Sequence, residues 1–359
     1  MRRRGEVKKI VVNILIGINL LAVLMLLFSY FSVFVPPDKW WFPSLFGLAY
    51  PFILLGNVFF ILMWLLIKPR FLFISLVAVL MGFGFVRRYI QLGGEELENG
   101  DIKVLSFNVM HFAGDGLEHQ KETAEKIIDF LQGQDADIIC LQEVRIRKNS
   151  IFNLAQTVEN LDSIHHYQYA RSSTTYGSVT MTRFPIVNMG EIRFENSRNI
   201  SIYTDVLIDN DTVRIFNIHL QSYQIDPNRY NIIESTGAAE SIEMEQVREV
   251  KSKFRNAYKL RAEQVREIRK YIDDSPYHVI LCGDFNDPPA SYSYRKLTRG
   301  LKDAFVISGR GVGRTYIGKL PSMRIDYILH SSGFLSYNFK TIDFRLSDHL
   351  PVSCFLVKE

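Results

Sequence analysis

The chain has 359 residues, of which 47% are hydrophobic and 22% are charged, and its formal net charge is +4. That length predicts two or three structural units, each able to bury a core, and the ordinary apolar content excludes collagen-like and wholly disordered chains. Three cysteines are too few for a disulfide framework in a chain of this size. The mean hydropathy of +0.03 is high for a soluble enzyme and low for a polytopic carrier, which indicates two unlike parts.

The first part is apolar and ends near residue 95. Almost charge-free runs cover residues 10–35, 45–67 and 71–86, and the first is long enough for a spanning helix. These segments lack the polar face of a soluble core helix, and no small-residue cleavage site follows the first. The sequence therefore predicts a membrane anchor over residues 1–94 with about three transmembrane helices.

Charged residues predict the orientation of this anchor. Five basic residues, from Arg2 to Lys9, precede the first run, and Lys68 and Arg70 lie between the second and the third. Because cytoplasmic loops carry an excess of Lys and Arg, the N-terminus is predicted to be cytoplasmic. Three spans then place everything after Ile90 outside the cytoplasm, in a multi-pass membrane protein. A re-entrant third segment would reverse that topology.

A short acidic linker, residues 95–100, precedes a second domain over residues 101–359. There, many strand-like apolar runs alternate with few helical patterns, which predicts an α+β fold of two packed sheets with helices outside. Between residues 222 and 272, a polar loop is followed by apolar residues at helical spacing, which predicts a long amphipathic helix. Covering a sheet is its ordinary role; contact with a membrane surface or gating of a substrate are the alternatives. The strand-like runs are residues 102–108, 137–144, 178–182, 201–208, 212–220, 278–282, 324–330 and 351–357.

Polar residues interrupt the apolar strands at their ends. Each has an ordinary explanation alone, because a histidine in a strand is commonly structural and an aspartate after glycine commonly forms a turn. Burying several carboxylates together is costly, however, unless cations or hydrogen-bond donors compensate. Hard oxygen ligands suit Mg²⁺, Mn²⁺ or Ca²⁺, and carboxylates with imidazoles at one divalent cation fit phosphate-ester hydrolysis. The residues are Asn108, Glu143, His219, Asp284, Asn286, Asp326, Asp348 and His349.

The ordered motifs SFNV, LQEV, NIHL, GDFND, RIDYI and SDHLPV resemble the endonuclease/exonuclease/phosphatase (DNase I-like) superfamily over about residues 101–359. This superfamily includes DNase I, apurinic endonucleases, neutral sphingomyelinases and inositol-polyphosphate 5-phosphatases. The resemblance implies a four-layered α/β sandwich, with two mainly antiparallel sheets flanked by helices and the site at one edge. It indicates the chemistry far better than the substrate.

The resemblance also implies a metal site and a site for the attacking water. Glu143 is similar to the family's principal metal-binding carboxylate, and Asn108 and Asp348 resemble further members of the metal site. Asp284 matches the residue that orients or deprotonates the water. Asn286 is expected to help hold that water and the phosphate.

Two histidines and two arginines complete the expected site. His349 resembles the imidazole that contacts the scissile phosphate, oriented by Asp326. His219 matches a second histidine of the DNase I and sphingomyelinase branches that assists the leaving group, and the sequence identifies no carboxylate partner for it. Arg183 and Arg324 are weaker candidates for phosphate contact, and a structural ion pair explains each equally well.

Charge bears on the substrate. Residues 101–359 hold 32 basic and 33 acidic residues, so the basic excess belongs to the anchor. Nucleic-acid binding through many phosphates normally needs a basic excess, whereas a membrane tether favours a lipid or another substrate near the bilayer. The sequence thus predicts a membrane-anchored, Mg²⁺-dependent phosphodiesterase or phosphatase with no evident protein partner. A nuclease is the alternative, and a catalytically inactive module that binds a phosphorylated ligand is the alternative of another class.

Overall fold

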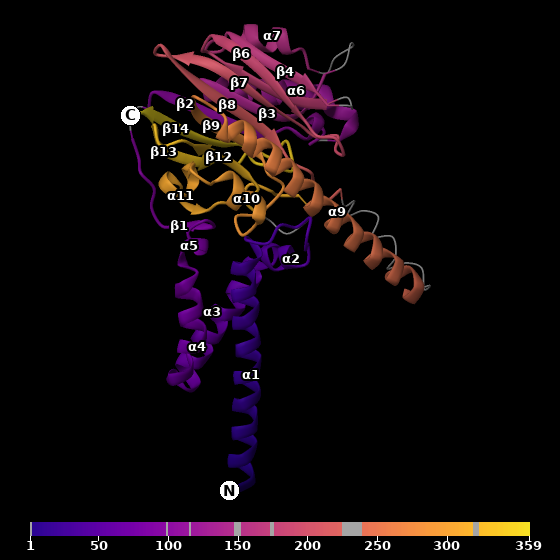
Figure 1. Cartoon of the computed structure of the whole chain (residues 1–359), viewed down its shortest axis with the longest axis vertical. Coiled ribbons are helices and arrows are strands. Elements are labelled where there is room, and N and C mark those ends of the chain that lie inside the picture. Colours follow the sequence, from indigo (N-terminus) through magenta and orange to yellow (C-terminus); the bar gives the residue numbers. More distant parts are fainter. Residues whose placement is uncertain are drawn as a thin grey trace.

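The computed structural model describes residues 2–97, 100–114, 116–146, 152–172, 176–224, 239–318 and 323–359. Most of the polar loop predicted before the long helix, residues 225–238, lies outside the described residues, as does Glu98 of the predicted linker. Within them, an elongated helical unit stands beneath a broader unit built of sheets and helices (Figure 1).

The helical unit packs three of its helices side by side (Figure 1). A chain of buried polar contacts joins them: Asn19 Nδ2 lies 2.5 Å from Ser75 Oγ, which lies 2.9 Å from Asn57 Oδ1, and Trp64 Nε1 donates to Asn19 Oδ1 at 2.9 Å. Such contacts hold helices together where apolar packing alone is not selective. The helices are α1 (Arg2–Ser32), α2 (Pro43–Leu48), α3 (Tyr50–Ile67), η1 (Pro69–Phe71), α4 (Phe73–Met81) and α5 (Phe83–Val86).

Two helices, not three, are long and apolar enough to cross a membrane in the described part of the chain. They are Lys8–Ser32 and Tyr50–Ile67, so the prediction of about three transmembrane helices is wrong in number. The predicted third run, 71–86, is interrupted at Gly82, where α4 ends and α5 begins. A Cβ at Gly82 would collide with the ring of Tyr30 on α1, so the chain approaches α1 too closely there for a larger residue.

Two six-stranded sheets form the centre of the second unit in the described residues. Most neighbouring strands are antiparallel, and the parallel pairs are β2 with β3 and β8 with β9. The first sheet has the order β13–β14–β2–β3–β5–β4, with β2 (Ile102–Asn108), β3 (Ile138–Arg145), β4 (His166–Arg171), β5 (Tyr176–Thr182), β13 (Phe334–Thr341) and β14 (Val352–Lys358). The second has the order β10–β12–β9–β8–β7–β6, with β6 (Ile186–Arg193), β7 (Ile200–Ile208), β8 (Asp211–His219), β9 (His278–Asp284), β10 (Lys302–Asp303) and β12 (Asp326–His330).

The sheets pack face to face and helices cover their outer faces, as the α+β prediction expects. In β3, Cys140 lies in the core between the sheets, whereas its neighbour Leu141 lies in the core beneath the outer helices. Both faces of such a strand are buried, which explains its continuous apolar run.

The three cysteines, Cys140, Cys282 and Cys354, are all buried between the sheets with free thiols. The remaining elements are η2 (Met110–Phe112), η3 (Leu117–His119), α6 (Gln120–Gln134) and α7 (Leu154–Asn160) on the first sheet's side, α9 (Ala239–Asp273) and α10 (Tyr292–Leu297) on the second's, and α11 (Ala304–Ser308).

The predicted amphipathic helix is α9, and its two halves differ. The C-terminal half covers the second sheet through Val265, Ile268 and Ile272. The N-terminal half extends beyond the sheets, toward the level at which α2 lies (Figure 1). The expected role of this helix, covering a sheet, therefore accounts for only the C-terminal half of its length.

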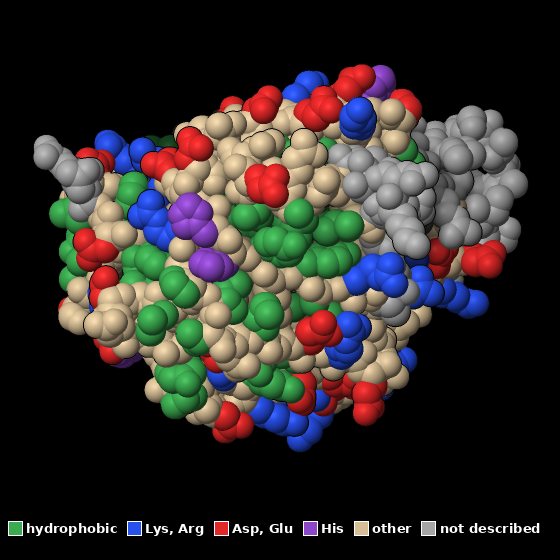
Figure 2. All heavy atoms as spheres, turned by 90° about the horizontal axis from the view of Figure 1, so that it is seen from above, with side chains coloured by type: hydrophobic (Ala, Val, Ile, Leu, Met, Phe, Trp, Pro, Cys, Tyr) green, Lys and Arg blue, Asp and Glu red, His purple; other side chains and the backbone are tan. Residues whose placement is uncertain are grey.

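The two units contact each other at several points. Arg266 of α9 donates to both carboxylate oxygens of Asp38 at 2.9 and 3.1 Å. A Cβ at Gly47 of α2 would collide with the backbone carbonyl of Ala290, so only glycine permits this approach. A short antiparallel pair of β1 (Ile90–Gln91) with β11 (Gly311–Val312) adds a further connection. On the face turned away from the helical unit, Lys and Arg side chains are interspersed with Asp and Glu (Figure 2).

Candidate active site

Strand pairing brings the predicted polar residues to one edge of the sandwich. In the first sheet the parallel strands β2 and β3 carry Asn108 and Glu143 to the same edge. In the second sheet Asp284 lies opposite both His219 of β8 and Asp326 of β12. Because the sheets face each other, these strand ends surround one pocket. Its lining includes Leu48, Met110, Glu143, Tyr223, Asp284, Asn286, Tyr316, Asp348 and His349.

Asp284 is buried at the end of β9 and accepts hydrogen bonds from two asparagines. The backbone N–H of Asn286 lies 2.7 Å from its Oδ1, and Asn286 Nδ2 lies 3.0 Å from its Oδ2. Asn108 Nδ2 donates to the same Oδ2 at 3.1 Å. Asn286 has φ 51°, a left-handed conformation that asparagine tolerates, and this turn directs its amide back at Asp284. Burial raises the pKa of Asp284 to about 7 because the ionised form is poorly solvated.

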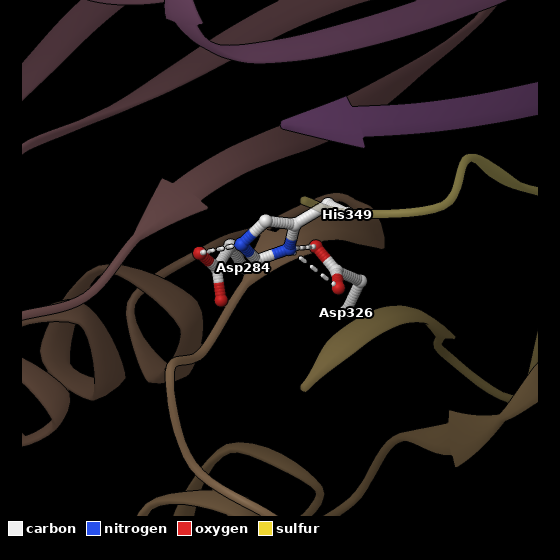
Figure 3. Close-up of side chains that lie close together, drawn as sticks. All are labelled: Asp284, Asp326 and His349. Atoms are coloured by element: carbon white, nitrogen blue, oxygen red, sulfur yellow. Dashed lines mark hydrogen bonds and ion pairs between the residues drawn. The ribbon is translucent and has the colours of Figure 1, made fainter. Parts of the chain in front are cut away.

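His349 is held between two carboxylates (Figure 3). Its Nδ1 lies 2.9 and 3.1 Å from the two oxygens of Asp326, and its Nε2 lies 3.7 Å from Asp284 Oδ2. Burial disfavours a charged ring, but the negative charges of Asp326 and Asp284 outweigh it and raise the pKa of His349 well above its usual value. The ring is therefore protonated at neutral pH, with Nε2 on the side of Asp284.

Glu143 is directed into the site by an irregularity in β3. The register of β3 against β5 shifts between Leu141 and Val144, and Glu143 has φ 57°. Its Oε2 lies 3.0 Å from His111 Nε2, and its Oε1 lies 3.4 Å from His219 Nε2. Burial alone would raise the pKa of Glu143, but these imidazoles lower it to about 2, so the carboxylate is ionised.

His219 has the carboxylate neighbours that the sequence did not identify. Besides Glu143, Asp284 Oδ2 lies 3.8 Å from its Nε2. Burial lowers the pKa of His219, so the ring is neutral at physiological pH. Among the described residues its Nε2 is a buried atom without a hydrogen-bond partner, which leaves a polar group available to a ligand.

Asp348 and Asn108 lie on the first sheet's side of the pocket. Asp348 is about one third exposed, at 33% of its side-chain surface, and burial followed by the charge of Glu143 raises its pKa. Asn108 Nδ2 reaches Glu143 Oε1 at 3.3 Å, and the Ser347 hydroxyl donates to the Asn108 carbonyl at 2.7 Å. Asn108 thus links the carboxylates of the two sheets.

Comparison with known proteins follows the same division of the chain. Residues 105–349 match the Endonuclease/Exonuclease/phosphatase family. The chain belongs to this family. Its members are typically hydrolases that act on phosphoesters, and they generally use a divalent metal. Residues 11–89 match a separate domain of unknown function, and no curated protein sequence matches the chain.

Solved structures of the endonuclease/exonuclease/phosphatase fold superimpose on the second unit at low identity. A family protein from Leptotrichia buccalis is 17% identical with a TM-score of 0.51, covering 71% of this chain and 99% of its own. The Bacteroides thetaiotaomicron mannosyl-6-phosphatase Bt3783 is 18% identical with a TM-score of 0.50, covering 72% and 100%. The human Nocturnin catalytic domain is 17% identical with a TM-score of 0.50, covering 74% and 96%. At these identities the likeness concerns the fold.

The structure does not bring the two predicted arginines into the site. Arg183 pairs with Asp137 at 2.8 Å, at the end of β3 opposite to Glu143. Arg324 is fully buried and donates to both oxygens of Asp303 at 3.0 and 2.6 Å. Both arginines therefore make the structural ion pairs that were the alternative explanation, and the expectation that they contact phosphate is corrected.

Sequence reasoning missed His111 and Arg261. His111 lies in η2, where it and its two neighbours all have positive φ, and its only sequence signal is its position just after the SFNV motif. Arg261 is fully buried on α9: its Nη1 donates to the Asn286 carbonyl, and its Nη2 lies 3.6 Å from Asp287 Oδ1. In the sequence it is one of many charged residues of an amphipathic helix, so nothing marks it.

Two groups of side chains could hold the family's divalent metal. Asp284, Asp326 and His349 offer ligand atoms within 4.8 Å of one another, but the Nδ1 of His349 is already bonded to Asp326. The second group is Glu143 with Asp348. Glu143 is ionised, and its charge adds to burial in raising the pKa of Asp348. A divalent cation between them would relieve that repulsion, so this group fits a hard cation better.

Proposed function

We propose that this chain is a membrane-anchored, Mg²⁺-dependent phosphoesterase that hydrolyses a phosphodiester or phosphomonoester by in-line attack of water. The proposal rests on one observation above all. The Asp284–Asn286 pair and the Asp326–His349 pair meet beside Glu143 at a single pocket. Phosphoester hydrolysis requires a group that accepts a proton from water, a positively charged hydrogen-bond donor for the phosphate, and carboxylates that can bind a metal cation. All three lie together here.

Asp284 is the residue that takes the proton of the attacking water. Its pKa of about 7 lies near the working pH, where a general base is most effective. Asn286 and Asn108 donate to its oxygens and so hold the carboxylate in one orientation. Arg261 fixes the Asn286 carbonyl from behind.

The two buried histidines act on the phosphate and on the leaving group. The protonated His349, oriented by Asp326, donates a charged hydrogen bond to a phosphate oxygen. The neutral His219, whose Nε2 lies 3.4 Å from Glu143 Oε1 and has no hydrogen-bond partner within the described residues, assists the leaving oxygen. Burial lowers the pKa of both rings, but only in His349 do the nearby carboxylates, Asp326 and Asp284, outweigh it.

Glu143, Asp348 and Asn108 would hold the cation, for which Mn²⁺ and Ca²⁺ are alternatives to Mg²⁺. When bound, it offsets the negative charge that builds up on the phosphate. Asn108 serves this site by bonding Glu143, and His111 holds the second oxygen of that carboxylate. These contacts keep the carboxylate ionised and turned toward the pocket.

Membrane anchoring is supported by the surface of the helical unit. Only 11% and 28% of the two candidate spans are buried, and large apolar side chains such as Leu24, Phe59 and Leu66 are exposed at 62%, 60% and 86%. A soluble core helix would bury these side chains. The buried contact of Asn19 with Trp64 makes α1 part of the packed unit, unlike a cleaved leader. With the N-terminus in the cytoplasm, two spans alone would return the chain to the cytoplasm. We place the catalytic unit outside because α4 and α5 run back along the helical unit toward it, at the end opposite to the N-terminus (Figure 1).

The favoured substrate is a lipid or another phosphoester near the bilayer. Residues 101–359 carry no basic excess, and binding a nucleic-acid backbone through many phosphates normally needs one. Binding without catalysis is disfavoured because each proposed catalytic position is occupied by a competent residue.

The decisive experiment is hydrolysis by the full chain purified in detergent, assayed with Mg²⁺ or with a chelator against bis-p-nitrophenyl phosphate, phospholipids in mixed micelles, and plasmid DNA. We expect Glu143→Ala and chelation each to reduce turnover at least a hundredfold. Glu159→Ala, an exposed glutamate on α7, is the matched control and should retain full activity.

Undiminished hydrolysis by Glu143→Ala would refute the site, and DNA nicking without lipid turnover would replace the favoured substrate by nucleic acid. Binding of phosphoesters without any turnover would favour the inactive module. Orientation is tested separately with a reporter fused after Glu359: activity of a reporter that works only in the cytoplasm would contradict the placement outside.

A further inference from the structure

A second hollow, here called the apolar groove, lies between the helical unit and α9. It has a volume of about 690 Å³. Six of its eight lining side chains are apolar, so a polar ligand would find few hydrogen-bond partners there. The walls are Trp41, Phe42 and Leu45 on one side and Gln246, Val247, Val250, Lys251 and Phe254 of α9 on the other.

The apolar groove and the active-site pocket are lined by neighbouring residues. Tyr223 lines the pocket, and its ring centroid lies 4.5 Å from that of Phe254, which lines the groove. On the other wall, Leu48 lines the pocket and Leu45, one helical turn earlier in α2, lines the groove. Trp41 and Leu45 pack against the cluster that contains Tyr223. Ser222 and Gln224 also line the pocket beside Tyr223, but the side chains that adjoin the two hollows on both walls are aromatic or aliphatic. An alkyl chain attached to a ligand in the pocket could therefore reach the groove along Tyr223 and Leu48.

The position of the groove matches the level of a membrane interface. One wall belongs to the segment that joins the two candidate spans, and the other is the projecting half of α9 (Figure 1). Val247 is 63% exposed and Phe42 is 45% exposed, and leaving such side chains in water is unfavourable by about 25 cal/mol per Å² of apolar surface. Contact with hydrocarbon removes that cost.

We propose that the apolar groove binds an acyl chain of a lipid phosphoester whose phosphate lies in the active-site pocket. This inference rests on the proposed phosphoesterase function and adds to it the class of substrate and the residues that select it. A nucleic acid would need several basic residues beside the groove, whereas Lys251 is the one cation in its described lining. An alkyl chain needs only the apolar walls.

The test uses the full chain in detergent mixed micelles with Mg²⁺ and the p-nitrophenyl esters of methyl, octyl and hexadecyl phosphate. For the wild type we expect kcat/KM to rise at least tenfold from the methyl to the hexadecyl ester. Val247→Glu puts a charge in the groove and should abolish that rise while changing methyl ester hydrolysis less than twofold. Val250→Trp, which fills the groove instead, should do the same.

The matched control is Val187→Glu, because Val187 of β6 is similarly exposed, at 56%, and lies outside the groove. It should preserve the full dependence on chain length. If wild-type kcat/KM is independent of chain length, or if the groove variants behave like Val187→Glu, the acyl-chain inference is wrong although the phosphoesterase stands. If no ester is hydrolysed at all, the proposed function itself fails.

Discussion

The charge of one buried ring depends on a single partner. His349 would lose its proton if burial alone acted on it, and Asp326, at 2.9 Å from Nδ1, is the nearest group that prevents this. A protonated ring helps to bind phosphate and a neutral ring does so less well. The pH at which activity falls on the alkaline side should therefore report this contact.

Asp326→Asn keeps an acceptor for His349 Nδ1 but removes the negative charge. We expect kcat to fall roughly 10²–10⁴-fold. The raised pKa of His349 should also fall, so the protonated ring is lost at a lower pH and the alkaline limb of the kcat profile moves to lower pH. The measurement is kcat from pH 5 to pH 10 with saturating Mg²⁺. A reduced kcat with an unmoved alkaline limb would mean that Asp326 does not act through the charge of His349.

Most of the site could be predicted at this scale because its residues interrupt apolar strands. Glu143 and Asp284 each end a buried run, and burying several such carboxylates together is costly unless cations or hydrogen-bond donors compensate. The contacts of His111 could not be predicted, since they depend on three consecutive residues with positive φ. Arg324 was ambiguous in the sequence because its partner, Asp303, lies on another strand.

At the scale of elements, the sequence shows buried strands better than edge strands. The unpredicted strands β13, β4, β10 and β6 are the outermost strands of the two sheets. An edge strand buries less of its surface, and β6 has five exposed residues among its eight, so it lacks a continuous apolar run. Hydropathy also does not show the break between α4 and α5 at Gly82, and so the third span was predicted. Only the structure shows that the close contact with Tyr30 requires a glycine at this position.

Helix α9 supports the active site from behind through Arg261. Arg261→Met removes the donor to the Asn286 carbonyl at nearly constant volume, so Asn286 and with it Asp284 lose their fixed position. We expect kcat to fall roughly 10–100-fold with little change in KM, and Arg261→Lys to recover part of the loss. Thermal unfolding measured in parallel separates this effect from global destabilisation.

Arg255→Met, at an exposed position of the same helix, is the control and should leave kcat unchanged. Equal values of kcat for Arg261→Met and Arg255→Met would show that Arg261 does not position Asn286.

At the scale of the whole molecule, the helical unit and the catalytic unit are joined by residues far apart in the sequence. Asp38 and Arg266 are separated by more than two hundred positions and form two hydrogen bonds. Burial would raise the pKa of Asp38, but Arg266 lowers it. A depressed carboxyl pKa stabilises the folded state above the unfolded pKa of about 4, and that contribution is lost as the pH falls through the folded pKa.

Asp38→Asn should therefore lower the melting temperature of the full chain at pH 7 by roughly 1–3 °C. The difference from the wild type should disappear as the pH falls through the lowered pKa of Asp38, because the native carboxyl is then protonated as well. Thermal scans in detergent across this range provide the measurement. The control is Asp343→Asn, whose ion pair with Arg345 has both side chains 70% exposed; it should change the melting temperature less. If the effect of Asp38→Asn persists at low pH, the ion pair of Asp38 with Arg266 is not its cause.

The burial of the three cysteines has a practical consequence. Cys140, Cys282 and Cys354 are at most 1% exposed, in the core between the sheets, so thiol reagents reach them only when the sandwich opens. A cysteine introduced at a surface position would react first, and a reagent that does not cross bilayers would reveal which side of the membrane that position faces. The rate at which the native thiols react would then measure global unfolding, without any added probe.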